Sequence, residues 1–311
     1  MKESLFYGKI LLFGEYGVIQ DSMGLSVPYD YYKGTLTFES DDTELKEMSN
    51  GSLKKYLSYL KDLHTQKDNL VELDLKKFEE DIDNGLLFDS TIPQGFGVGS
   101  SGALVAAVYD QYAINKIGEN SVSNEQILEL KKIFSQMENY FHGKSSGLDP
   151  LICYLNLPIL IKSQDELESP QVPESSIDGK GAIFLLNTGN PGKTEPMVNI
   201  FMEKLKQKGF RKVMKQEFKK YNDACIEAFL NKDFQPLLSN VKQLSTVLFD
   251  HFRPMIPDVF HKFWKEGIET DSYYLKLCGS GGGGFIIGFT KDIEVAKEKL
   301  KSHQLDVIYQ F

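Results

Sequence analysis

A glycine-rich loop that runs directly into a helix is the feature that most constrains this chain. Residues 94–103 read QGFGVGSSGA, and an apolar, helix-favouring stretch over 104–114 follows without a break. Glycines let the backbone approach a ligand without Cβ collisions, and a helix N-terminus adds free amides and a positive dipole end. The loop is either a tight turn or a phosphate site, and the paired hydroxyls of Ser100 and Ser101 favour the phosphate site.

The loop differs from two common nucleotide-binding patterns. Gly97-x-Gly99-x-x-Gly102 matches the dinucleotide fingerprint, but a polar turn separates it from the preceding strand. No acid stands at a strand end about 20 residues further on, as that fingerprint requires. A Walker A loop is excluded as well, because no lysine follows the last glycine.

A second glycine loop lies near the end of the chain. Residues 279–284 hold five glycines in six positions, between the apolar strands predicted over 274–277 and 285–289. A hairpin needs one or two glycines, and each one costs roughly 0.5–1 kcal/mol of chain entropy. We therefore expect this backbone to pack against a ligand or against the first loop.

Two carboxylates flank a Gly/Ser turn. Glu138 lies on a helix marked by a capping box at Ser123 and an apolar stripe with steps of 3 and 4, and Asp149 follows eleven residues later. One carboxylate could bind Mg²⁺ and the other could face a substrate hydroxyl. The plainer alternative is a solvated helix acid and a turn acid, with His142 as a helix-terminal cation.

Lys9 is placed inside an apolar strand predicted over residues 5–12. A lysine in such a strand must carry its ammonium group to water or to a partner. It is therefore either an edge-strand lysine or one half of an ion pair.

Composition limits the class of protein. The 311 residues carry 35 basic and 44 acidic side chains, a net charge of −9, which argues against nucleic acid or an anionic membrane as a partner. A chain of this length predicts one large domain or two. The three cysteines lack a CxxC spacing, so we expect reduced thiols in a cytoplasmic protein, without disulfides or structural zinc. We also expect no signal peptide and no transmembrane helix.

The remaining pattern predicts an α+β fold. A turn over 14–17 is expected to lead into a short strand at Val18-Ile19, and a polar segment over 163–180 is expected to form a loop or domain border. The other predicted elements are strands at 35–38, 85–88, 182–186 and 307–308, helices at 52–63 and 293–300, and helical segments through 197–265.

Taken together, the motifs resemble those of the GHMP kinases, and within that family the mevalonate kinases. GKILLFGEYGV at 8–18, the loop at 93–103 and KLCGSGGGG at 276–284 match the three family motifs in order. HGKSSGLD at 142–149 is similar to the H-G-x-P-S-G-x-D segment of mevalonate kinases, and NTGNPGKT at 187–194 to their N-T-G-x-P-x-x-T stretch. The resemblance covers about residues 8–289.

The resemblance implies a two-domain GHMP kinase fold. A ribosomal-protein-S5-like N-terminal domain is expected over residues 1–178 and a ferredoxin-like C-terminal domain over 179–311, with ATP in the cleft between them. The implied partners are ATP and a small hydroxylated metabolite, and the chain is expected to be a monomer or a homodimer.

The resemblance also implies roles for single residues. Asp149 would take or orient the hydroxyl proton, and Lys9 would pair with it. Ser101 and Glu138 would hold Mg²⁺. The residues implied to bind the ATP phosphates are Gly95, Gly97, Val98, Gly99, Ser100, Ser101 and Gly102. Those implied near the acceptor and the transferred phosphate are Glu15, Tyr16, Ser146, Thr194, Gly279 and Ser280.

The acceptor stays open at this point. Tyr16 occupies a position where mevalonate kinases usually have histidine, and Tyr16 and Gly102 are both seen in some phosphomevalonate kinases. Ser145 replaces the usual proline, and Cys278 and Ser280 replace threonine and alanine. The intact H-G-x-x-S-G-x-D segment favours mevalonate, the precursor of isoprenoids. The alternatives are phosphomevalonate or another metabolite as acceptor, and a catalytically inactive binding protein of the same fold.

Overall fold

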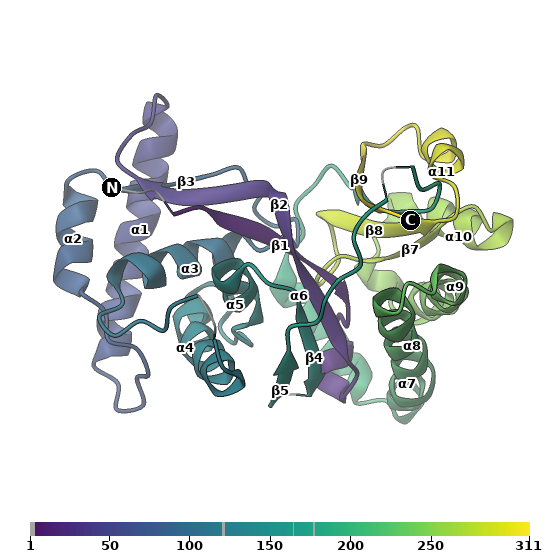
Figure 1. The fold of residues 1–311 in the computed structure, drawn as a ribbon, viewed down its shortest axis with the longest axis horizontal. Coiled ribbons are helices and arrows are strands. Elements are labelled where there is room, and N and C mark those ends of the chain that lie inside the picture. Colours follow the sequence, from purple (N-terminus) through teal and green to yellow (C-terminus); the bar gives the residue numbers. More distant parts are fainter. Residues whose placement is uncertain (1–3, 120–121, 164, 177) are drawn as a thin grey trace. The chain divides into compact units, whose positions relative to one another are not determined.

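The computed structural model describes residues 4–119, 122–163, 165–176 and 178–311, and it has the two-domain α+β architecture predicted from the sequence (Figure 1). The chain forms two compact units. Unit 1 holds Met1–Lys9, Val27–Pro93 and Gly99–Leu157, and unit 2 holds Ile10–Ser26, Gln94–Val98 and Pro158–Phe311. Strands β1 (Phe6–Phe13) and β2 (Gly24–Thr37) run from one unit into the other. The boundary at residues 178/179 stays a prediction.

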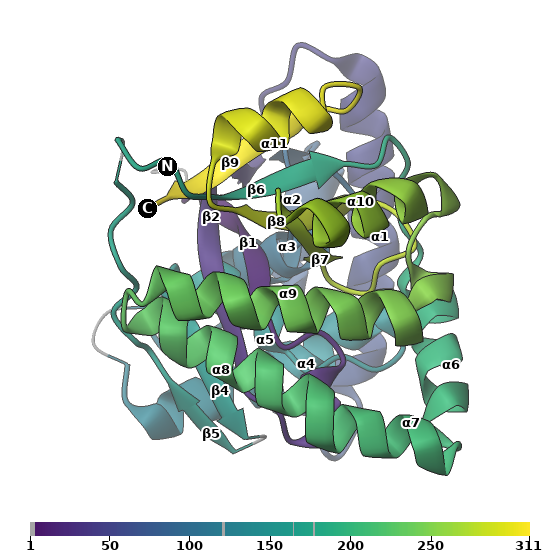
Figure 2. The same ribbon diagram turned by 90° about the vertical axis from the view of Figure 1, so that its right-hand side faces the viewer.

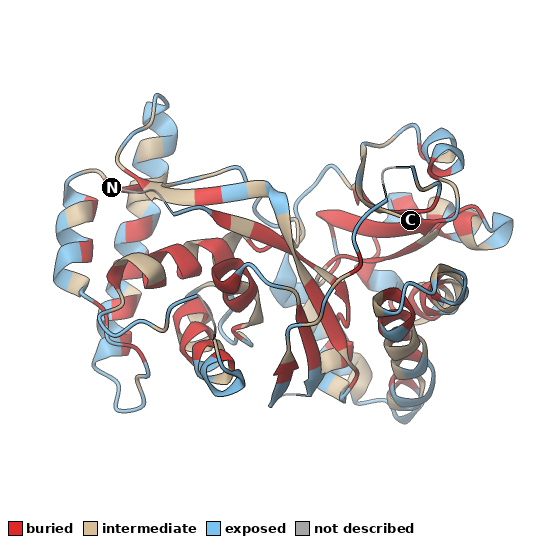
Figure 3. Cartoon of the chain, viewed as in Figure 1, coloured by how far each residue is buried: buried red, intermediate tan, exposed pale blue. Residues whose placement is uncertain are grey.

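Unit 1 combines strands β1 and β2 with a layer of helices. Its other elements are α1 (Thr43–His64), α2 (Leu75–Asp83), β3 (Leu87–Ser90), α3 (Ser100–Tyr112), α4 (Asn124–His142) and α5 (Leu148–Leu155). Strand β3 pairs antiparallel with the C-terminal end of β2. Helices α3 and α5 pack against each other and against α4, and most of their residues are buried (Figure 3).

Capping explains where two helices of unit 1 begin. The Ser123 capping box starts α4 as predicted, and Gly143 follows its last residue. Helix α1 begins earlier than the predicted residue 52, because the Asp42 side chain accepts a hydrogen bond from the Leu45 amide and caps the helix.

Unit 2 is built on an antiparallel sheet with strand order β7-β8-β6-β9. The strands of this sheet are β6 (Ala182–Asn187), β7 (Tyr274–Leu277), β8 (Phe285–Thr290) and β9 (Leu305–Gln310). Two further strands of unit 2 are β4 (Ile159–Ser163) and β5 (Glu166–Glu168). Its helices are α6 (Thr194–Leu205), α7 (Lys208–Val213), the π-helical η2 (Met214–Phe218), α8 (Lys219–Leu230), α9 (Phe234–His251), the 3₁₀ turns η3 (Arg253–Met255) and η4 (Asp258–Phe260), α10 (His261–Thr270) and α11 (Ile293–Lys299).

The central strands of this sheet are shielded from water. Every residue of β8 is buried, and so are the first five residues of β6. Helix α9 packs against β7 and β8, and α8 lies along α9 (Figure 2). The predicted strands at 182–186, 274–277 and 285–289 are thereby confirmed.

One local prediction is wrong. Val18 and Ile19 belong to a 3₁₀ turn, η1 (Gly17–Gln20), and not to a strand. Gly14 and Tyr16 have φ angles of 108° and 59°, so the chain curls back on itself, and the Val18 amide bonds to Gly14 O. The predicted loop at 163–180 contains β5, and its positions 164 and 177 lie outside the described residues.

All three cysteines are free and buried. In the described part of the chain, no helix combines the length and apolar character that crossing a membrane requires.

Candidate active site

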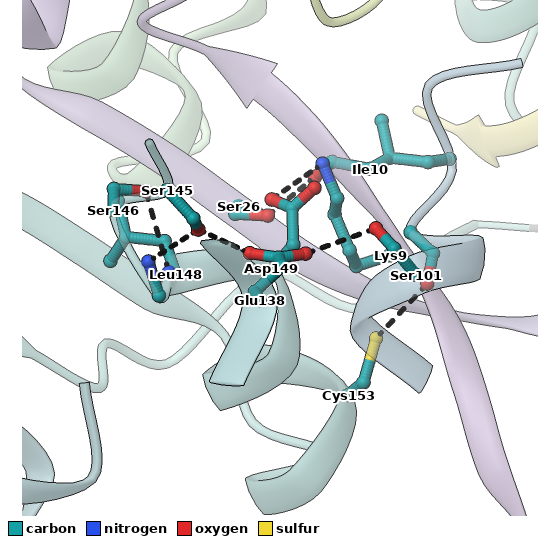
Figure 4. A network of polar contacts seen from close by, with 12 residues as sticks. Lys9, Ile10, Ser26, Ser101, Glu138, Ser145, Ser146, Leu148, Asp149 and Cys153 are labelled. Carbon is teal, nitrogen blue, oxygen red and sulfur yellow. Dashed lines mark hydrogen bonds and ion pairs between the residues drawn. The ribbon is translucent and has the colours of Figure 1, made fainter. Parts of the chain in front are cut away.

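Lys9 and Asp149 form an ion pair in unit 1, with Nζ 2.8 Å from Oδ1 (Figure 4). The Lys9 side chain is 4% exposed and that of Asp149 is 40% exposed. Lys9 comes from β1, and Asp149 is the second residue of α5, in the first turn of that helix. The pair therefore joins a buried cation to a carboxylate that water or a ligand reaches.

Glu138 is held by two hydroxyl groups. It lies in α4 and is 3% exposed, and its carboxylate accepts hydrogen bonds from Ser101 Oγ at 3.0 Å and from Ser145 Oγ (Figure 4). Ser101 Oγ is also 3.1 Å from His142 Nε2. Burial, and after it the charge of Asp149, raise the pKa of Glu138 to about 7, although both hydroxyl hydrogen bonds oppose the shift.

Glycines bring the backbones of this site together. Gly99 is the N-cap of α3 at φ 86°, and a Cβ there would lie 2.9 Å from Lys9 Cγ. A Cβ on Gly102 would lie 2.8 Å from the Asp149 carbonyl carbon and 2.9 Å from Pro150 N. The glycine at position 102 thus has a local cause: α3 and α5 approach each other too closely for an alanine side chain.

The turn before Asp149 is tied to α4. Ser135 Oγ donates to Ser145 O at 2.6 Å, and the Ser145 amide donates to Asn139 Oδ1 at 2.7 Å. A Cβ on Gly147 would lie 2.0 Å from Lys131 O, so only glycine fits there. These contacts fix the start of α5 and therefore the position of Asp149.

In unit 2, residues 94–98 are enclosed by two other segments. The Gly192 amide donates to Gly95 O at 2.8 Å, and a Cβ on Gly97 would lie 2.8 Å from Cys278 O. A Cβ on Gly284 would lie 2.6 Å from Phe96 Cα. The expectation that the second glycine loop packs against the first is confirmed.

The turn at residues 14–17 meets the same glycine loop. Lys276 donates to the Glu15 carboxylate, and both side chains are buried, at 1% and 4% exposure. Tyr16 donates its hydroxyl to Ser280 O at 2.7 Å, and Ser280 Oγ is 3.4 Å from Thr194 Oγ1 at the start of α6.

Comparison with known families identifies a domain that contains most of this site. Residues 60–156 match the family model described as the GHMP kinases N terminal domain. This stretch contains the loop into α3, Glu138 and Asp149. This part of the chain is therefore similar to the N-terminal domain of GHMP kinases.

Curated relatives of this chain include two mevalonate kinases. The enzyme of Pyrococcus abyssi is 26% identical over 212 residues, which cover 61% of this chain and 58% of that enzyme. The enzyme of Archaeoglobus fulgidus is 25% identical over 289 residues, which cover 91% of this chain and 90% of that enzyme. The chain thus spans less than two thirds of the first relative and most of the second.

Solved structures share the fold at lower identity. The Methanococcus jannaschii mevalonate kinase has a TM-score of 0.59 at 18% identity, covering 99% of this chain and 98% of that one. The Streptococcus pneumoniae phosphomevalonate kinase, in complex with phosphomevalonate and AMPPNP, has a TM-score of 0.64 at 13% identity, covering 100% and 99%. These similarities establish the GHMP kinase fold.

The site residues predicted from the sequence fall into two groups. Unit 1 brings together Lys9, Ser101, Glu138 and Asp149, with Gly99, Ser100 and Gly102 in the first turn of α3 or just before it. Unit 2 holds Glu15, Tyr16, Gly95, Gly97, Val98, Thr194, Gly279 and Ser280. Ser146 lies in the turn before α5, is exposed, and accepts only a long 3.4 Å hydrogen bond from the Leu148 amide.

The family implies Mg²⁺, and the donor set of unit 1 fits that ion. Mg²⁺ prefers oxygen ligands and usually takes one or two carboxylates together with substrate phosphates. Ser101 and Glu138 supply a hydroxyl and a carboxylate in contact with each other. Among the described residues no three His, Cys, Asp or Glu side chains form a metal-binding group, so phosphate oxygens would complete the coordination.

Sequence reasoning missed two partners. Lys276 appeared only as part of a motif, although it neutralises Glu15 inside unit 2. Ser145 appeared only as a departure from the family pattern, although its hydroxyl contacts Glu138. A lysine inside an apolar strand is a usable signal for a buried partner, as it was for Lys9, whereas nothing in the sequence distinguishes Ser145 from Ser146.

Proposed function

We propose that this chain is an ATP- and Mg²⁺-dependent kinase that transfers the γ-phosphate of ATP to the primary hydroxyl of mevalonate, a step in the synthesis of isoprenoid precursors. The comparisons support a phosphotransferase with an alcohol group as acceptor. The acceptor itself is the finer part of the proposal.

The Lys9–Asp149 pair carries the proposal. Asp149 would take or orient the proton of the acceptor hydroxyl, and its exposed fraction of 40% leaves room for that contact. Lys9, 2.8 Å away, keeps the carboxylate ionised and favours the developing alkoxide. A structural ion pair alone would not need one partner at the start of a helix beside a phosphate-type loop.

Phosphate binding is assigned to the segment from Gly95 to Gly102. Because Gly99 has no side chain, no N-cap side chain covers the first-turn amides of α3, and these point toward an incoming anion. The bound Mg²⁺, held by Ser101 and Glu138, would neutralise charge on the β- and γ-phosphates. Gly279 and Ser280 belong to the loop assigned to the transferred phosphate.

Mevalonate is favoured by two observations. The segment from His142 to Asp149 keeps the spacing of mevalonate kinases, and the two archaeal relatives are mevalonate kinases. Ser146 lies in the segment from His142 to Asp149 and Thr194 is the first residue of α6, and we assign both hydroxyl groups to the acceptor. Phosphomevalonate is the second candidate, because Tyr16 and Gly102 match some phosphomevalonate kinases and one such enzyme shares the fold.

The proposal includes a cytoplasmic location, with a monomer or a homodimer as the working form. Three free, buried cysteines support a reducing compartment.

The test is ADP release with Mg·ATP and a panel of mevalonate, 5-phosphomevalonate, galactose and homoserine. Asp149→Asn is measured beside the wild-type chain, with Asp110→Asn as the matched control, since Asp110 also pairs with a lysine of unit 1. We expect turnover of mevalonate in the wild-type chain and in Asp110→Asn, and its loss in Asp149→Asn.

Each other outcome changes a different part of the proposal. Turnover of phosphomevalonate in place of mevalonate keeps the mechanism and replaces the acceptor. Folded protein that binds Mg·ATP and turns over none of the four compounds would contradict the assignment of mevalonate as the acceptor. A folded chain without Mg·ATP binding would support the inactive binding protein.

A further inference from the structure

The side chain of Tyr16 is committed to the protein interior. Its residue is 7% exposed, and its hydroxyl donates to the backbone oxygen of Ser280 at 2.7 Å. Its ring packs on Phe201 and Phe252, with centroids 4.5 and 5.8 Å away. Burial, followed by the charge of Glu15, raises the pKa of Tyr16 well above its ordinary range, so the hydroxyl stays a donor. Within unit 2, Tyr16 therefore faces a loop carbonyl and two aromatic rings.

The backbone at Tyr16 adopts a strained conformation in the structure in which the hydroxyl reaches Ser280 O. Its φ of 59° lies in the left-handed region, which is unfavourable for a residue that carries a side chain. Position 16 carries a tyrosine, although glycine would adopt this backbone conformation at a lower free-energy cost. The strain indicates that the direction of the Tyr16 side chain matters.

A second tie joins the same two segments. Lys276, which precedes the glycine loop by three residues, donates to the Glu15 carboxylate and, at 2.9 Å, to Leu277 O. Its ammonium also lies 5.8 Å from the Phe13 ring centroid. Glu15 and Tyr16 are adjacent, so two neighbouring side chains contact Lys276, in the strand that precedes the glycine loop, and Ser280 inside the loop.

The glycine loop needs such ties to have one conformation. Gly279, Gly281, Gly282, Gly283 and Gly284 all have positive φ, and because they lack side chains the loop is held by the contacts and hydrogen bonds of its backbone. Its far side is anchored by the Gly282 amide on Met255 O at 2.6 Å and the Gly284 amide on Asn190 O at 2.7 Å. Ser280 lies between Gly279 and these anchors, and its contact with Tyr16 restrains the near side.

We propose that Tyr16, together with the Glu15–Lys276 pair, is a positioning residue that holds the loop 279–284 in its phosphate-binding conformation, and that it does not select the acceptor. The inference rests on the proposed function for the role of the loop. It replaces the expectation that Glu15 and Tyr16 contact the acceptor. Tyrosine in place of histidine at position 16 then has no bearing on the choice between mevalonate and phosphomevalonate.

The test is Tyr16→Phe, which removes one hydroxyl and keeps the ring. Tyr273→Phe is the matched control, because Tyr273 is a fully buried tyrosine of unit 2 whose hydroxyl donates to Phe263 O at 2.9 Å. The readouts are the affinity for Mg·AMPPNP, an ATP analogue that keeps the third phosphate group, by calorimetry, amide hydrogen exchange over 279–284, and KM for each acceptor separately from kcat.

For Tyr16→Phe we expect Mg·AMPPNP affinity to fall and exchange over 279–284 to speed up, each by about three- to tenfold, the loss of one hydrogen bond. We expect KM for the acceptor to stay within about twofold, and Tyr273→Phe to match the wild-type chain in all three readouts. A raised acceptor KM with unchanged Mg·AMPPNP affinity and unchanged exchange would overturn the proposal.

The ion pair gives an independent variant. Glu15→Gln alone leaves a buried unpaired ammonium, so the double variant Glu15→Gln/Lys276→Met, which removes both charges, is used in case the single variant does not fold. Faster exchange over 279–284 in the folded double variant supports the proposal, and exchange equal to the wild-type chain contradicts it. Exchange and Mg·AMPPNP binding need no turnover, so failure of the proposed acceptor does not disturb this test.

Discussion

The Lys9–Asp149 pair of unit 1 and the Lys276–Glu15 pair of unit 2 join the same chemical groups in different surroundings. The Asp149 side chain is 40% exposed, whereas the Glu15 side chain is 4% exposed and its lysine 1%. A carboxylate that water reaches is free to exchange a partner for a substrate. A carboxylate that is buried together with its lysine keeps that partner and fixes the geometry of the segments that carry the two side chains. The comparison teaches that exposure, and not the kind of ion pair, separates a reacting group from a positioning one.

The largest effect is expected from Asp149→Asn. Asp149 is the proposed general base, so its removal should lower kcat by about 10²–10⁴-fold. Stability should fall by about 1–3 kcal/mol, because the buried Lys9 ammonium loses its counter-charge while the Asp149 side chain itself is partly solvated. Steady-state kinetics and urea unfolding of the same preparation check both numbers. A large loss of stability with nearly normal kcat would reverse the assignment of the two pairs.

Glu15→Gln should show the opposite balance. It leaves the Lys276 ammonium buried without its counter-charge, which typically costs about 3–5 kcal/mol of unfolding free energy. The chemical step in the folded fraction should change far less than in Asp149→Asn. Denaturant unfolding monitored by fluorescence measures the loss, with exposed Glu298→Gln as the control, since its pair with Lys301 is on the surface. Equal stability of the two variants would contradict the conclusion that the Glu15–Lys276 pair is buried away from water.

Glu138 allows a pH test of the unit 1 site. Its pKa is raised from 4.5 to about 7, so between these values the folded chain binds more protons than the unfolded chain. Stability contributed by this group is therefore fully present below pH 4.5 and lost as pH rises to 7, by about 3 kcal/mol in total.

Glu138→Gln removes this dependence. Without Mg²⁺, the variant should gain stability relative to the wild-type chain as pH rises from 5 to 8, by up to about 3 kcal/mol. Unfolding free energies measured at several pH values give the difference directly. A difference that does not change with pH would mean that Glu138 is ionised throughout.

Gly102→Ala is expected to have the smallest effect. The new methyl group would lie 2.8 Å from backbone of Asp149, and overpacking of this kind costs about 1–3 kcal/mol. A lowered kcat should accompany the loss, since Asp149 must move. Gly51→Ala is the control: it lies in α1 with open space around it, and it should gain about 0.5–1 kcal/mol.

Local signals explain what was predictable in the fold. The Ser123 capping box and the apolar stripe gave α4, and the apolar runs gave β6, β7 and β8, because these patterns act within a few residues. The prediction of a strand at Val18 and Ile19 was wrong, because the left-handed backbone of Tyr16 overrides the β preference of these two side chains. The glycine motifs were recognisable, but their mutual packing was only an expectation.

The sequence by itself determined the family motifs, the helix that carries Glu138, and the candidacy of Lys9 and Asp149. It did so because glycine spacing, capping and a charge in an apolar strand are local facts. Only the tertiary structure decided that Lys276 pairs with Glu15, 261 residues away, and that Tyr16 is turned inward to Ser280. Contacts at such separation depend on how sheets and turns pack, and hydrophobic periodicity does not encode which buried charge meets which.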